Sequence, residues 1–170
     1  ILILDSTNSA FNPGDNDFQD TAPTANVFYV NGGAGRTNVS SQNFIAYCFA
    51  EKKGFSKFGS YTGNGNADGT FIYTGFKPAW FLTKATSTTG QWVLQDTSRS
   101  PINPANLQLY PSLNNADSAE GSGATWDFTS NGVKLRNSAA NYNASGATYI
   151  YMAFAENPLV GTNNIPATAR

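Results

Sequence analysis

The chain has 170 residues, of which 40% are hydrophobic, 14% aromatic and only 12% charged, and its formal net charge is -1. This length supports a hydrophobic core without disulfide bonds. The basic residues are scattered, which excludes a nucleic-acid stripe and a basic membrane patch, and the longest apolar runs, 44–50 and 149–155, are too short to span a bilayer. Asn, Ser, Thr and Gly supply the polarity, a composition typical of β-structure.

The first part of the chain contains three short apolar stretches, ILIL at 1–4, VFYVN at 27–31 and NFIAYCFAE at 43–51. Short runs of this kind predict β-strands. Cys48 lies inside the third run, so we expect it to be a buried, unreactive thiol. Because it is the only cysteine, an intrachain disulfide is excluded.

Residues 55–75 predict a linking β-hairpin with arms at 55–61 and 70–76. The intervening GNGNADG sequence is rich in residues that adopt left-handed backbone conformations at low cost, which favours a tight turn at the tip. No helix is predicted after these glycines, which argues against a dinucleotide-binding loop.

Calcium binding is the alternative interpretation of this tip. Asn64, Asn66 and Asp68 alternate as in the first half of an EF-hand loop. The twelfth position of that motif requires glutamate, and Gly75 stands there instead. We therefore expect a turn, with Asp68 as a weak metal candidate.

The second half of the chain is dense in strand signals. Segments 79–85 and 91–97 flank the polar loop TSTTG and predict a hairpin. The sequence SNG at 130–132 predicts a second turn, and the apolar run at 148–156 predicts a central strand. No sustained helical periodicity is present. The fold class expected is all-β, an antiparallel β-sandwich of jelly-roll-like form.

An internal repeat is suggested by the match between 43–51 and 148–156, which share Ile, Phe, Ala and Glu at equivalent positions. We interpret the chain as an incomplete first copy and a complete second copy of one module, and expect the missing front of the first copy upstream of Ile1. Glu51 and Glu156 end the matching runs, which suggests that they accept turn N–H groups. The expected domains are 1–54, the hairpin at 55–75, 76–157 and a polar C-terminal arm at 158–170.

A second acidic cluster, Asp15, Asp17 and Asp20, could bind a hard cation such as calcium, or it could be a solvated loop.

The sequence contains few patterns that indicate catalysis. The chain has no histidine, which excludes Ser-His, Cys-His and His-metal arrangements. Carboxylate pairs for glycoside hydrolysis remain formally open, and no catalytic residue is assigned; the candidates are Asp96, Asp117, Glu120, Asp127 and Glu156. We expect Asp96 to form a structural ion pair with Arg99.

Aromatic residues offer candidate glycan contacts because a ring face can stack on the apolar face of a sugar. Trp126, Tyr110 and Trp92 are the candidates, with packing in the core as the alternative. Asn38 and Asn143 begin glycosylation sequons, which have meaning only in a secretory pathway.

The stretches FAEKKGFSKFGSYTGNG, GFKPAWFLTK and MAFAENP resemble, over nearly the whole chain, a domain near the C-terminus of large virion proteins of tailed bacteriophages, especially marine ones. The resemblance implies a non-enzymatic tail-fibre, adhesin or capsid-attached fibre protein located in the virion, without catalytic residues or cofactor. It implies a homo-oligomer, a trimer being one form, with other virion proteins and a host-surface glycan as candidate partners, and neither nucleic acid nor membrane insertion. A carbohydrate-binding module and a polysaccharide depolymerase domain are the alternatives.

Overall fold

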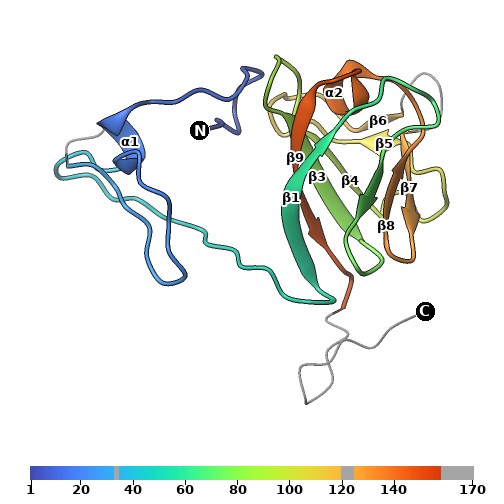
Figure 1. The fold of residues 1–170 in the computed structure, drawn as a ribbon, viewed down its shortest axis with the longest axis horizontal. Helices are drawn as coiled ribbons and strands as arrows, with labels where there is room; N and C mark the ends of the chain where they lie inside the picture. Colours follow the sequence, from blue (N-terminus) through green and yellow to red (C-terminus); the bar gives the residue numbers. More distant parts are fainter. Residues whose placement is uncertain (33–34, 120–124, 158–170) are drawn as a thin grey trace. The chain divides into compact units, whose positions relative to one another are not determined.

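The structure is a computed structural model that describes residues 1–32, 35–119 and 125–157. The chain divides into two compact units (Figure 1). The first comprises Ile1 and Phe11–Phe49, and the second comprises Leu2–Ala10 and the chain from Ala50 onward. Residues 55–75 therefore belong to the same unit as 76–157 and do not form a separate linking domain.

The second unit is an all-β sandwich of antiparallel sheets, which confirms the predicted all-β antiparallel sandwich; the jelly-roll form stays a prediction. One sheet has the order β1-β9-β3-β4, a second has the order β2-β8-β7, and β5 pairs with β6. The strands are β1 (Ser56–Thr62), β2 (Phe71–Tyr73), β3 (Trp80–Ala85), β4 (Val93–Asp96), β5 (Leu107–Gln108), β6 (Ser118–Ala119), β7 (Trp126–Thr129), β8 (Gly132–Leu135) and β9 (Thr148–Phe154). Figure 1 shows the sheets packed face to face.

Strand β9 lies between β1 and β3, as expected for a central strand. Its alternate residues Tyr149, Tyr151 and Ala153 are buried, because successive side chains of a strand point to opposite faces. Tyr151 stands opposite Gly59 of β1, and a Cβ atom at position 59 would approach the Tyr151 ring to 3.0 Å. The glycine thus leaves room for this ring in the core.

Aromatic side chains fill the space between the two sheets. Trp126 of β7 is completely buried and meets the Phe81 ring of β3 edge-on at 5.2 Å between centroids. Tyr61 stacks on Tyr149 at 5.0 Å. Such aromatic pairs bury large apolar areas and add about 0.5–1.5 kcal/mol each beyond area burial. The core therefore joins the two sheets into one unit.

The predicted hairpin of β3 and β4 is present, and the turn predicted at 130–132 joins β7 to β8, which pair with each other. The hairpin predicted at 55–75 is wrong: β1 pairs with β9 in one sheet and β2 pairs with β8 in the other. The intervening loop crosses between the sheets. It is held there because the Gly63 N–H donates to the Ala147 carbonyl and the Gly69 N–H donates to the Leu135 carbonyl.

The segment Leu2–Ala10 contains no strand and lies against β3 and β4 of the second unit. The Trp92 indole donates to the Ile3 carbonyl at 3.0 Å, and the Lys84 ammonium donates to the Asn8 carbonyl at 2.9 Å. Lys84 is buried, and burial lowers the pKa of its ammonium group. These two side chains fasten the N-terminal segment to the sheet.

The first unit contains one short helix, α1 (Asp15–Phe18), and no strand among its described residues. Residues 43–50 form no strand and are exposed, so they do not reproduce the buried strand β9, and the structure does not support the duplicated module. The difference arises because β9 has β1 and β3 beside it, whereas no described strand accompanies 43–50. Cys48 is consequently exposed, contrary to the expectation. The expected arm at 158–170 lies outside the described residues.

Candidate functional site

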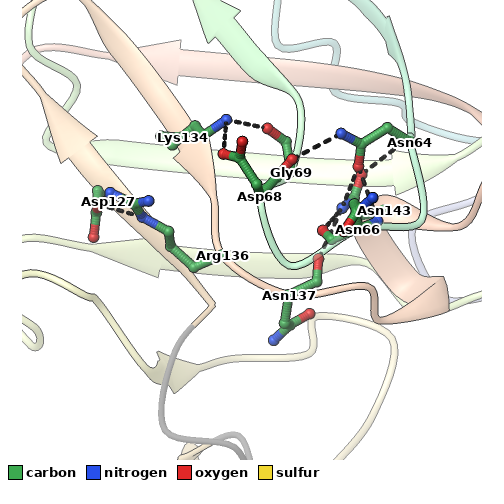
Figure 2. Close-up of polar contacts among 9 residues, drawn as sticks. All are labelled: Asn64, Asn66, Asp68, Gly69, Asp127, Lys134, Arg136, Asn137 and Asn143. Atoms are coloured by element: carbon green, nitrogen blue, oxygen red, sulfur yellow. Dashed lines mark hydrogen bonds and ion pairs between the residues drawn. The ribbon is translucent and has the colours of Figure 1, made fainter.

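The loop between β1 and β2 is organised by one buried side chain, Asn143, at the end of helix α2 (Ala140–Asn143) (Figure 2). Its amide nitrogen donates to the Asn66 carbonyl at 2.9 Å and to the Asn137 carbonyl at 2.8 Å. Its amide oxygen accepts the Asn64 backbone N–H at 3.0 Å. Asn143 therefore holds the loop against the segment that leads into α2.

The asparagines of the loop complete this network with their own side chains. The Asn64 amide donates to the Asp68 carbonyl at 2.9 Å, and its oxygen accepts the Asn66 N–H at 3.0 Å. Gly65 has a φ of 66°, so a glycine does occupy a left-handed position, as expected for a turn. The Asn64 oxygen is engaged within the turn, which argues for a structural role instead of calcium ligation.

Two basic residues beside the loop form ion pairs: Lys134 lies on the neighbouring strand β8, and Arg136 follows that strand. The Lys134 ammonium lies 2.7 Å from the exposed Asp68 carboxylate and also donates to the Gly69 carbonyl (Figure 2). The hydrogen bond from Lys134, and then its charge, lower the pKa of Asp68. The Arg136 guanidinium pairs with Asp127. Asp68 and Asp127 thus each have a basic partner.

Two of the metal candidates, Asp17 and Asp68, are paired with basic side chains. Asp17 is only 2% exposed, and its carboxylate lies 3.0 Å from the Arg36 guanidinium, a cation that already neutralises it. Asp20 accepts a hydrogen bond from Asn12, whereas the side chain of Asp15 lies outside what the structure describes. Across residues 1–32, 35–119 and 125–157, no group of three or more His, Cys, Asp or Glu residues is placed to hold a metal ion.

The three candidate glycan contacts do not form a stacking surface, which corrects the prediction. Trp126 is in the core, and Trp92 is buried with its indole bonded to Ile3. Tyr110 is partly buried against the core, and its hydroxyl donates to the Gln108 amide oxygen. Core packing, the alternative interpretation of these residues, explains their burial.

The carboxylates considered for glycoside hydrolysis are largely engaged by arginines. Asp96 accepts from the Arg99 guanidinium at 2.6 Å, which confirms the expected ion pair. Burial alone would raise the pKa of Asp96, but the hydrogen bonds from Arg99 outweigh it, and the pKa lies below its usual value. Asp117 lies 3.8 Å from the same guanidinium, and Glu120 falls outside the described residues.

Glu51 has a structural role, as expected, but the N–H group it accepts lies in a strand and not in a turn. Its carboxylate accepts the backbone N–H of Phe58 at 3.1 Å and lies 3.5 Å from the Lys57 ammonium. Phe58 belongs to β1, an edge strand of its sheet. Glu51 therefore occupies a donor on the open edge of β1 and limits pairing with another chain there.

The two sequons differ in accessibility. Asn38 is exposed in the first unit, whereas Asn143 is completely buried with both ends of its amide hydrogen-bonded. Asn143 therefore offers no acceptor for a glycan in the folded state.

The first unit carries an apolar surface that sequence reasoning missed, because its residues were expected to lie in buried strands. Two stretches expose large apolar side chains, residues 27–29 and 44–49. Ile45 and Tyr47 are 80% and 81% exposed, and Phe49 is 60% exposed. Beside them is a hollow of about 540 Å³ whose lining includes Phe28, Phe44 and Cys48. A sequence signal was available: residues 37–50 contain no charged residue.

These features define a class of protein: one unit is an antiparallel β-sandwich, and the other, the first unit, exposes apolar residues. Residues 1–158 match the family described as a domain of unknown function (DUF7483), and the chain belongs to that family. No curated protein and no solved structure matches the chain. Among the residues that the structure describes, no helix has the length and apolar character needed to cross a membrane.

Proposed function

We propose that the chain is a non-enzymatic structural and attachment domain of a bacteriophage virion, part of a tail fibre or surface fibre, and that it acts as a homo-oligomer. The observation that carries the assembly role is the exposed apolar stretch 44–49 in the first unit. Large contiguous apolar surfaces on soluble proteins mark interaction sites. The location in a virion rests on the sequence resemblance.

The buried aromatic rings and the paired carboxylates of the sandwich support this proposal. Its aromatic side chains, including Trp126 and Trp92, are buried and serve stability, which does not favour a carbohydrate-binding module. Asp96 and Asp127 are engaged by arginines, and this pairing does not favour a depolymerase, which requires a free pair of carboxylates facing a substrate.

Attachment would use the loops at the ends of the sandwich. The loop at 63–69 is fixed by Asn143 and presents the exposed residues Asn66 and Asp68 beside the Lys134 ammonium. A rigid loop that presents amide and charged groups binds a polar surface at a lower entropic cost than a mobile one. A host-surface glycan is the candidate partner.

The proposal is tested by the mass of the purified chain in solution. We expect light scattering at micromolar concentration to give a multiple of the 18.1 kDa chain mass. A strictly monomeric species would contradict the assembly role. In parallel, we expect no new reducing ends after incubation with host capsular polysaccharide or lipopolysaccharide glycans, and their appearance would favour the depolymerase alternative.

A further inference from the structure

We propose that the outer face of the sheet β2-β8-β7 binds a neutral sugar unit of a glycan, which stacks on the aromatic rings of Phe71 and Tyr73. This inference rests on the attachment role of the proposed function and names both the surface and the class of ligand that serve it. The strands that form this sheet all belong to the second unit.

The outer face consists of the residues that alternate with buried ones along the three strands, because successive side chains of a strand point to opposite faces. The buried residues between them are Ile72, Phe128 and Val133. The outer face comprises Phe71, Tyr73, Asp127, Thr129, Gly132 and Lys134. These residues form two rows across the sheet, since Phe71 pairs with Lys134 and Lys134 with Asp127. An aromatic ring thus lies in register with charged groups.

The two aromatic residues of the outer face are accessible. Phe71 is 44% exposed and Tyr73 is 63% exposed, whereas Ile72 between them is 3% exposed. A Cβ atom at position 132 would stand 2.9 Å from the Phe71 ring, so this ring extends over Gly132 of β8. A Cβ atom at Gly75 would stand 3.6 Å from the Tyr73 hydroxyl. Glycines beside both rings therefore leave the space that the rings occupy along the sheet.

Hydrogen-bonding groups border these rings. Lys134, the cross-strand neighbour of Phe71, holds the Asp68 carboxylate at 2.7 Å, and the Asp68 side chain is 86% exposed (Figure 2). The Arg136 guanidinium, which is 43% exposed, pairs with Asp127 (Figure 2). An exposed carboxylate accepts hydrogen bonds from hydroxyl groups, and an exposed guanidinium donates them. Because ion pairs already order these side chains, binding costs less conformational entropy.

The charges of this surface cancel in pairs, which favours a neutral ligand. Asp68 is paired with Lys134, and Asp127 with Arg136. An excess of basic groups would favour an acidic sugar, and an excess of carboxylates would favour a cation. A neutral pyranose suits the face as it stands, because its apolar C–H groups stack on an aromatic ring while its hydroxyls exchange hydrogen bonds with the paired charges.

The apolar area of the outer face fits a small ligand better than a protein partner. Stable protein interfaces bury about 1,200–2,000 Å² in total. An aromatic side chain buries about 150–250 Å², so Phe71 and Tyr73 together supply at most about 500 Å². The other residues of the face are polar, charged or glycine. Two rings with a charged border are sufficient to hold one sugar unit.

Saturation-transfer NMR of the full chain tests the class of ligand. The neutral probes are maltohexaose, cellohexaose and mannohexaose, and the acidic probe is an oligogalacturonate. We expect saturation transfer to at least one neutral probe at millimolar concentration. No transfer to any neutral probe would overturn the proposal, and so would transfer to the acidic probe alone.

Substitutions of Tyr73 test the place of binding. We expect Tyr73→Ala to raise the dissociation constant of the bound probe at least about tenfold, because aromatic anchors dominate such contacts. Tyr73→Phe keeps the ring and should retain binding. Leu113→Ala removes an exposed apolar side chain from the turn after β5 and is the matched control, with binding equal to that of the wild type. Equal binding by Tyr73→Ala, or loss of binding in Tyr73→Phe, would overturn stacking on this ring.

Light scattering of the same variants distinguishes a glycan site from a contact between copies. We expect Tyr73→Ala to keep the mass of the wild type. If the wild type is an oligomer and Tyr73→Ala falls to 18.1 kDa, the face is a subunit contact and the glycan proposal is overturned. An oligomer that binds no neutral probe overturns this inference alone, whereas a monomer that binds one overturns only the assembly role.

Discussion

Replacing Trp126 by alanine is expected to destabilise the sandwich by about 3–5 kcal/mol, the range measured when a large aromatic side chain is removed from a core. The Trp126 ring is completely buried and contacts Phe81, Phe128 and Tyr142 edge-on, with centroids 5.2, 6.5 and 5.5 Å away. Its removal leaves a cavity between the two sheets. The strands on both sides would have to move inward to fill it. Urea denaturation followed by far-ultraviolet circular dichroism measures this loss.

The control for this variant is Tyr73→Ala, which removes an aromatic ring from β2 that is 63% exposed. We expect it to change the free energy of unfolding by less than about 0.5–1 kcal/mol, because exposed substitutions leave no cavity. If Trp126→Ala had a similarly small effect but abolished binding to a glycan, the assignment of Trp126 to the core would be wrong.

Asn143→Ala is expected to cost about 3 kcal/mol, because it removes at least three hydrogen bonds worth about 1 kcal/mol each. The variant removes the hydrogen bonds that the Asn143 amide makes with the Asn64 N–H and with the carbonyls of Asn66 and Asn137. The loop between the sheets would lose its attachment to α2. A lowered midpoint of thermal unfolding, with fast amide exchange in residues 63–69, would measure both effects.

Asn66→Ala is the matched control for that variant. Asn66 is exposed, and the bonds recorded for it involve its backbone, which alanine retains. We expect its stability to stay close to that of the wild type. Equal destabilisation by the two substitutions would mean that Asn143 does not organise the loop.

Local patterns were sufficient to predict much of the sandwich. The hairpin formed by β3 and β4 followed from two apolar runs around a polar Gly-containing loop, and β9 followed from its long apolar run. The hairpin was predictable because its two strands are neighbours in the chain, and β9 was predictable because a long apolar run is itself a local signal for a buried strand.

The failures have a common cause, which is that strand partners far apart in the chain are not encoded locally. Residues 43–51 and β9 have similar sequences, yet only β9 has strands on both sides. In the same way, the turn residues at 63–69 are compatible with a hairpin, and only the distant strands β8 and β9 determine that the loop crosses between sheets. Strand propensity depends on such context.

The site was less predictable than the fold. Asn143 attracted attention only as part of a sequon, because its partners Asn64 and Asn66 lie more than seventy residues earlier in the chain. The sequence alone is compatible with Trp126 and Trp92 on the surface or in the core. Successive side chains of a strand point to opposite faces, and the register of the strand decides which face is buried. That register became visible only with the sheets assembled.

Hydrogen–deuterium exchange of the peptide covering residues 44–49 tests most directly whether the exposed apolar stretch of the first unit is an assembly surface, with a β9 peptide as the protected reference. At high concentration we expect slow exchange in 44–49, because amides covered by a contact between copies exchange slowly, and rapid exchange on dilution. Rapid exchange at every concentration, with β9 still protected, would contradict this account of the molecule.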